Sequence, residues 1–177
     1  MGKKRIGIII GVLTLVLVVS YYFYNSKQEL YGNDKDSIVK VIKSIDDYEN
    51  KEVEILEISD FNDVRIVGFL SNDSPSYIEF IKNQKENYVW RHIESRDNES
   101  FSMFSPLSGS SKMMVVTNYE NKIAKMQVDI NGKPLEQIFT PHQANVTWVD
   151  KPQTNKDSYE YRNYKYYDIN GNLIKEN

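Results

Sequence analysis

Two histidines, two tryptophans and a tyrosine-rich tail hold the side chains that could bind a ligand or take part in catalysis. His92 lies close after Trp90 in a strand-like segment, and His142 follows Pro141 in a predicted loop. Neither histidine has a partner at the short spacing of a zinc motif, and the 177 residues include no cysteine. Thiolate zinc sites, iron–sulfur clusters and disulfide bonds are therefore excluded, and we expect no metal ion and no cofactor.

Catalytic motifs are absent from the sequence, which has no phosphate-binding loop, dinucleotide fingerprint or nucleophile elbow. Carboxylates gather in residues 46–49 and 60–63, but these clusters fall at a helix end and in a turn, where a solvated role is expected. Residues 129–132 and 168–171 both read Asp-Ile-Asn-Gly, which is typical of a hairpin turn and lacks the other acids of a calcium loop. We expect no catalytic residue and no enzymatic activity.

Candidate binding residues form two groups. The first would line a pocket in the curve of a sheet and consists of Trp90, His92 and Trp148. The second belongs to the tail, where aromatic residues alternate with cations, a pattern that suits stacking on wall sugars or on a protein partner. Its members are Tyr159, Tyr161, Tyr164 and Tyr166. The alternative, which the strand propensity of tyrosine favours, is an edge hairpin whose tyrosines pack on the domain.

The clearest pattern is a membrane anchor in residues 6–24, which contain no charged side chain. As a helix this segment would span about 28 Å, close to the ~30 Å hydrocarbon core of a bilayer. It ends in an aromatic belt formed by Tyr21, Tyr22 and Tyr24. It is preceded by the basic residues Lys3, Lys4 and Arg5. The positive-inside rule then places residues 1–5 in the cytoplasm and the chain after residue 25 outside, as a single-pass signal-anchor protein.

A cleaved signal peptide is the alternative to an anchor. It is less favoured, because the small-residue cleavage pattern is missing and bulky tyrosines follow the apolar run. A lipoprotein is excluded, because there is no cysteine to acylate. The abundance of Lys, Ile, Asn and Tyr indicates A/T-rich codons, and so the cell envelope of a low-GC bacterium.

The charge distribution excludes a nucleic-acid partner. Without Lys3, Lys4 and Arg5, the chain has 19 basic and 25 acidic residues. A protein that neutralises phosphates needs a basic surface instead.

The pattern after the anchor predicts a spacer at 25–33, a domain at 34–150, a linker at 151–158 and a tyrosine-rich hairpin at 159–177. Residues 34–48 have an apolar stripe at helical spacing, formed by Ile38, Val41, Ile42, Ile45 and Tyr48. About seven strands then follow. They are drawn from nine candidate segments, namely 52–58, 64–70, 77–82, 88–94, 101–104, 112–118, 122–130, 133–139 and 146–149. Leu56 is expected to form a β-bulge beside Ile55.

These elements predict an α+β fold in which one amphipathic helix packs on a curved antiparallel sheet, a cystatin-like or NTF2-like arrangement. A β-sandwich or small barrel is the alternative. The expected function is that of a membrane-tethered, extracytoplasmic binding module for an envelope protein, a peptide or a wall component. The alternative is a small-ligand binder or envelope enzyme with a pocket in the curve of the sheet.

Overall fold

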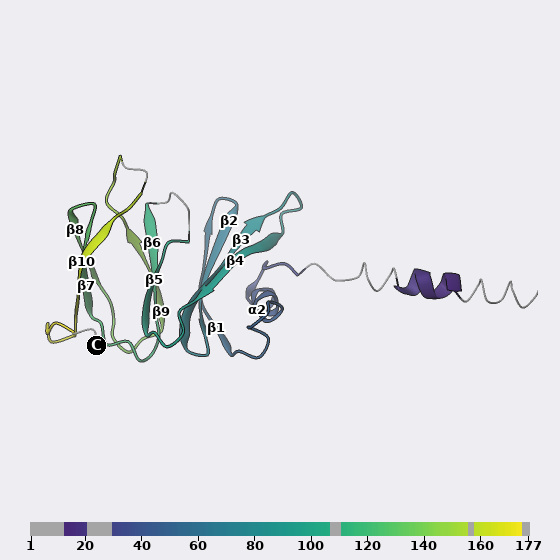
Figure 1. The fold of residues 1–177 in the computed structure, drawn as a ribbon, viewed down its shortest axis with the longest axis horizontal. Coiled ribbons are helices and arrows are strands. Elements are labelled where there is room, and N and C mark those ends of the chain that lie inside the picture. The colour runs from purple at the N-terminus through teal and green to yellow at the C-terminus, as the bar shows by residue number, and fades with distance from the viewer. Residues whose placement is uncertain (1–12, 21–29, 107–110, 156–157, 175–177) are drawn as a thin grey trace, which may run out of the picture. The chain divides into compact units, whose positions relative to one another are not determined.

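The computed structural model describes residues 13–20, 30–106, 111–155 and 158–174 (Figure 1). The chain divides into two compact units, Met1–Leu30 and Tyr31–Asn177. In the first unit residues 13–20 are helical. Within the described residues no helix has both the length and the apolar character needed to cross a membrane. The predicted anchor lies largely outside those residues, as do the flanking Lys3, Lys4, Arg5, Tyr21, Tyr22 and Tyr24, so it stays a prediction.

The second unit contains one helix and ten strands in its described part. Their bounds are α2 (Lys35–Lys43), β1 (Val53–Phe61), β2 (Val64–Ser71), β3 (Ser74–Lys82), β4 (Tyr88–Ser95), β5 (Phe101–Phe104), β6 (Lys112–Thr117), β7 (Lys125–Ile130), β8 (Lys133–Ile138), β9 (Asn145–Asp150) and β10 (Tyr161–Tyr167). All pairings between the strands are antiparallel. The strands form three sheets, with the orders β1-β2-β3-β4, β5-β6-β9 and β10-β7-β8.

Helix α2 begins at a capping box. The Asp34 carboxylate accepts a hydrogen bond from the Ser37 backbone N–H at 2.8 Å, and the Ser37 hydroxyl accepts one from the Asp34 N–H. These bonds, with the nearby positive end of the helix dipole, hold the pKa of Asp34 below its usual value. The helix ends at Lys43, with Ser44 as its C-cap, so it is shorter than the predicted 34–48, and the chain then turns with Asp47 at positive φ.

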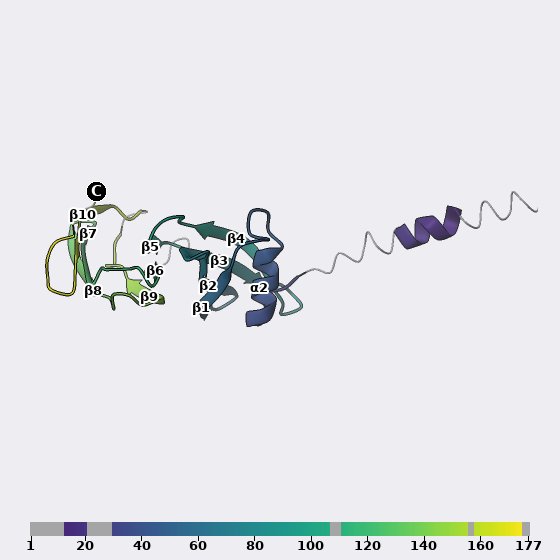
Figure 2. The ribbon, with the colours of Figure 1, turned by 90° about the horizontal axis from the view of Figure 1, so that it is seen from below.

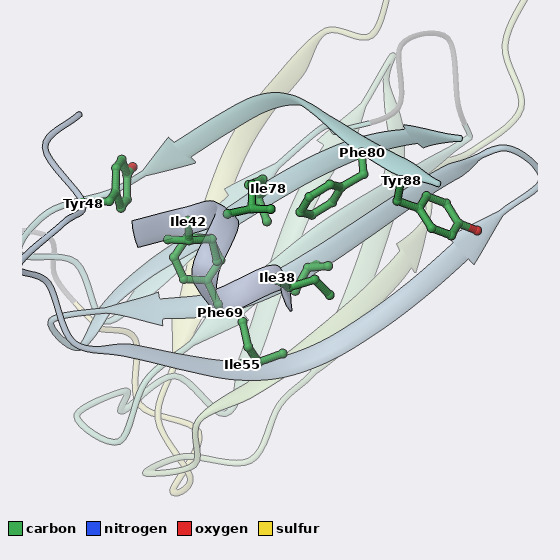
Figure 3. Close-up of a cluster of buried hydrophobic side chains, with 10 residues drawn as sticks. Ile38, Ile42, Tyr48, Ile55, Phe69, Ile78, Phe80 and Tyr88 are labelled. Atoms are coloured by element: carbon green, nitrogen blue, oxygen red, sulfur yellow. The ribbon is translucent and has the colours of Figure 1, made fainter. Parts of the chain in front are cut away.

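The first sheet (β1–β4) packs α2 against one of its faces (Figure 3). The core there joins Ile38, Val41 and Ile42 of the helix to apolar side chains of the strands, namely Ile55, Val67, Phe69, Ile78, Phe80 and Tyr88. The predicted bulge is confirmed, because the β1–β2 register shifts between Ile55 and Glu57. Ile55 therefore faces the helix, and Leu56 packs in the core on the opposite face.

The three sheets stack in layers, in the order α2, first sheet, second sheet, third sheet (Figures 1 and 2). A second core lies between the first sheet and the second (β5-β6-β9), where Ile66, Leu70 and Tyr77 meet Phe104, Met114, Val116 and Val146. A third core lies between the second sheet and the third (β10-β7-β8), where Met113 and Val115 meet Met126, Val128 and Ile130. Strand β2 is buried on both faces, as its continuous apolar run predicts.

The mixed α and β architecture is confirmed, but its arrangement differs from a single curved sheet. The described residues form ten strands rather than about seven, and these strands divide among three sheets. The predicted linker and hairpin also belong to the layered unit, because β10 pairs with β7 along the third sheet. A strand's alternation shows that one of its faces is buried, but not which sheet covers it.

Candidate functional site

The predicted trio Trp90, His92 and Trp148 does not converge on one site. Trp90 pairs with Phe80, whose side chain faces α2, whereas His92 pairs with Glu79 on the opposite face of the first sheet. A register shift between these two pairs places both Arg91 and His92 opposite Glu79. This bulge breaks the alternation that would have put Trp90 and His92 on the same face.

Trp148 lies on the far side of the first sheet from Trp90. Its ring packs edge-on against Phe61, with 4.9 Å between the ring centroids, in the core between the first and second sheets. The indole N–H donates to the Glu57 carboxylate at 2.8 Å and lies 3.2 Å from the Ser59 hydroxyl. Trp148 therefore joins β9 to β1, which is the strand of the first sheet farthest from β4. This placement gives no support to a shared pocket.

His92 instead packs beside Tyr77, with the ring centroids 5.5 Å apart, and Tyr77 contacts Phe104 at 5.0 Å. Burial, together with the charges of Glu94 and Glu79, raises the pKa of the Tyr77 hydroxyl to about 12. The folded state thus holds this proton more strongly than the unfolded chain does. The stabilisation that the raised pKa of Tyr77 gives the folded state is complete below pH 10, the usual pKa of tyrosine. It is lost as the pH rises toward 12.

We therefore expect Tyr77→Phe to reduce the loss of stability between pH 10 and 12. The measurement is urea unfolding at several alkaline pH values, with Phe104→Leu as the control, because Phe104 contacts the Tyr77 ring and has no ionisable group. If the two variants lose stability identically across this range, Tyr77 is not the group responsible.

The tail tyrosines are divided between core and surface. Tyr159, Tyr161 and Tyr166 pack against the third core. Tyr164 is exposed and stacks on Tyr166, with 6.2 Å between the centroids and 18° between the ring planes. Lys151 lies over the Tyr159 ring at 4.1 Å from its centroid. Three of the four candidates thus have a structural role, and only Tyr164 presents much of its surface to solvent.

A polar pocket of about 940 Å³, which the sequence did not predict as a site, lies where connections from all three sheets meet. Its lining comes from the β2–β3 turn, the β4–β5, β6–β7 and β8–β9 connections and the segment after β10. We call it the loop-end pocket. Its lining includes Asp73, Glu99, Asn118, Tyr119, Glu120, Lys122 and His142.

Asn118 is the residue that joins the walls of the loop-end pocket. Its side chain is only 5% exposed. The amide nitrogen donates to the carbonyl oxygens of Asp73, at 2.8 Å, and of Glu99, at 3.3 Å. The amide oxygen accepts from the Glu120 backbone N–H at 2.9 Å. One buried amide thus fixes connections from the first and second sheets to each other, which favours a rigid pocket.

The β6–β7 connection is also hydrogen-bonded to the β8–β9 connection. Asn121 is fully buried, and its carbonyl oxygen accepts from the His142 N–H at 2.7 Å. The His142 Nδ1 lies 3.3 Å from the Tyr119 carbonyl oxygen, and His142 has a positive φ of 57°. Tyr119 is 53% exposed and donates its hydroxyl to Glu54 at 2.8 Å, a bond that raises the pKa of Tyr119.

The loop-end pocket is predominantly acidic. Asp73, Glu99 and Glu120 contribute three carboxylates, against the ammonium group of Lys122. Lys122 and His142 also line a neighbouring hollow of about 480 Å³, together with Pro141, Asp168 and Ile169. Ile169 is 74% exposed there. Carboxylates, a lysine and apolar side chains are thus presented together on one surface.

The loop-end pocket lies at the opposite end of β3 from the point where the chain enters the unit. Strand β3 begins at Ser74, in the lining of the pocket, and ends at Lys82. Lys82 pairs with Tyr88, whose carbonyl oxygen accepts from the Gly32 N–H at 2.8 Å. The two ends of this nine-residue strand are about 26 Å apart.

The local sequence contained a partial signal for this site. Asn72 and Asp73 both have positive φ and form a two-residue hairpin turn. Asn118 ends a predicted strand segment, 112–118, and directly precedes the turn predicted at 119–121. What the sequence does not show is that these turns meet, because that depends on the stacking of three sheets.

Among the residues that the structure describes, no group of three or more His, Asp or Glu side chains could hold a metal ion. Comparison with known proteins finds no match to this chain among family models, curated protein sequences or solved structures.

Proposed function

We propose that this protein is a membrane-tethered, extracytoplasmic binding module of a bacterial envelope, and that the loop-end pocket receives its partner. The observation that carries the proposal is the position of the pocket, at the end of β3 remote from the entry of the chain at Gly32. A module tethered through the predicted helix at 6–24 would hold its entry end near the bilayer. Its opposite end would then be open to other envelope components.

The chemistry of the loop-end pocket favours a peptide or protein partner with cationic groups. Its three carboxylates outnumber its one ammonium group, so the local field attracts positive charge. The exposed side chains of Tyr119 and Ile169 supply apolar contact area beside those charges. The fixed hydrogen bonds of Asn118 and Asn121 keep the surface preorganised, which lowers the entropic cost of binding.

A single-cysteine crosslinking experiment tests location and binding together, because the chain has no cysteine of its own. In Tyr119→Cys, a membrane-impermeant photoreactive maleimide is added to intact cells that produce the full chain. Glu136→Cys, on the solvent face of the third sheet, is the matched control. We expect both cysteines to be labelled, and a discrete adduct to form on irradiation from position 119 alone.

Two results would contradict the proposal. If neither cysteine is labelled until the cells are opened, the domain is not outside. If both are labelled but position 119 gives no adduct, or the same adducts as position 136, the loop-end pocket is not the binding surface.

A further inference from the structure

The chain is fixed to the first sheet as soon as it enters the second unit. The Asn33 side-chain oxygen accepts from the Tyr88 backbone N–H at 2.9 Å. Arg65 donates to the carbonyl oxygens of Gly32, at 2.9 Å, and Asn33, at 2.8 Å. Arg65 is itself held by a two-bond pair with Asp60, and its guanidinium lies 3.9 Å from the centroid of the Tyr88 ring. The entry point is therefore a defined position on the surface of the domain.

Gly32 is essential to this fixation. A Cβ added to it would lie 2.3 Å from Cε1 of the Phe80 ring, so the backbone rests directly on that ring. Phe80 pairs with Arg65 on one side and with Trp90 on the other. Arg65, Phe80 and Trp90 are thus paired neighbours across β2, β3 and β4. Trp90 lies next to Phe80, on whose ring the entering chain rests.

Trp90 is partly open to solvent at the edge of the first sheet. It is 42% exposed, and its neighbour Val89 is 40% exposed on the same outer strand, β4. Isolated exposed apolar residues are common on protein surfaces. What distinguishes this pair is its position beside the entry of the chain, at the open edge of β4, where the Trp90 side chain points to the face that carries α2 and the Val89 side chain to the opposite face.

Covalent geometry limits how far this edge can lie from the membrane. The predicted span ends at Tyr24, and the seven residues 25–31 reach at most about 25 Å when fully extended. A tether this short gives any surface beside Gly32 a high effective concentration at the bilayer. Tryptophan prefers the headgroup layer, where its ring is partly desolvated and its indole N–H stays hydrated.

We infer that the edge of β4 carrying Val89 and Trp90 rests on the lipid surface of the membrane that holds the tether. This inference depends on the proposed tether and adds a second contact, between domain and lipid. The chain beyond the anchor has more acidic than basic residues, so its net charge does not favour anionic lipid, and the proposed contact does not depend on it. Burial of apolar surface drives the contact, and zwitterionic lipid is sufficient.

The test uses the two tryptophans as separate reporters in the full chain. The protein is reconstituted into dioleoylphosphatidylcholine vesicles with or without lipid brominated at the 6 and 7 positions of one acyl chain. Trp148→Phe leaves Trp90 as the reporter, and Trp90→Phe leaves Trp148, which is bonded to Glu57 inside the domain. We expect bromolipid to reduce Trp90 emission by about half or more, and Trp148 emission by far less.

Flotation on a density gradient separates this inference from the tether on which it rests. Chains that float with vesicles but show no bromolipid quenching of Trp90 would overturn the lipid contact and leave the tether standing. Chains that do not float would overturn both. If Trp148→Phe does not fold, the Trp90 signal is obtained as the difference between the unaltered chain and Trp90→Phe, with the same criteria.

Discussion

Gly68→Ala is expected to lower the free energy of unfolding by about 3 kcal/mol, at the upper end of the usual cost of overpacking a core. Gly68 lies in β2, paired with Glu57 on one side and Tyr77 on the other. A Cβ on Gly68 would lie 2.4 Å from Cγ2 of Val146, which projects from β9 in the second sheet. Real Cβ atoms do not approach other atoms this closely, so either the Val146 side chain leaves its position in the core or the first and second sheets move apart.

The mechanism is tested by a double-mutant cycle with Val146→Ala, a change that removes the methyl group at the clash. The single Val146 variant leaves a small cavity and has its own cost. The double variant should be more stable than the two single effects predict, by about 1–3 kcal/mol. Urea unfolding of the full chain in detergent measures all four proteins. Simple additivity of the two effects would refute the close approach of the sheets at Gly68.

The sequence predicts the individual strands well because their signals are local. The alternation of Met126, Val128 and Ile130 with polar residues predicts one buried face, and these three residues are buried. Asn131 and Gly132 predict a two-residue hairpin, and both have positive φ. Pro134 restricts its segment to an edge strand or a helical first turn, and β8 is the outer strand of its sheet.

The stacking of the sheets could not be predicted in the same way. An isolated glycine in a strand indicates the close approach of another backbone or side chain, but not its source. For Gly68 the source is Val146, far along the chain in another sheet. Likewise the bulge at Arg91, which separates Trp90 from His92, leaves no local signal in a segment where polar and apolar residues are mixed.

The candidate site was missed for a related reason. Sequence reasoning favoured tryptophans, histidines and tyrosines as binding residues, but large aromatic side chains also fill cores. Trp148 and three of the tail tyrosines do so here. The loop-end pocket is built instead from Asn118, Asn121 and turn residues, whose role depends on bonds between connections that are distant in the sequence.

Asn118→Asp is expected to lower the free energy of unfolding by about 2–4 kcal/mol at pH 7, because it replaces a buried donor by a charged acceptor. The Asn118 amide nitrogen donates to the carbonyl oxygens of Asp73 and Glu99. A carboxylate would leave both without this donor and would repel them, at about 1–3 kcal/mol for each buried group left unsatisfied. Asn145→Asp is the matched control, since Asn145 is exposed and its amide donates within β9, to the Thr147 hydroxyl at 3.5 Å.

The pH dependence of Asn118→Asp distinguishes this mechanism from a general loss of packing. Burial and two facing carbonyl oxygens should raise the pKa of the introduced carboxyl group in the folded state. The protonated group can donate one hydrogen bond again, so the deficit relative to the unaltered chain should shrink as the pH falls from 7 to 4. Asn145→Asp should show no such recovery. A deficit of Asn118→Asp that is constant with pH would mean that Asn118 does not join the connections through its amide nitrogen. The loop-end pocket would then lack the rigidity on which the proposed binding function depends.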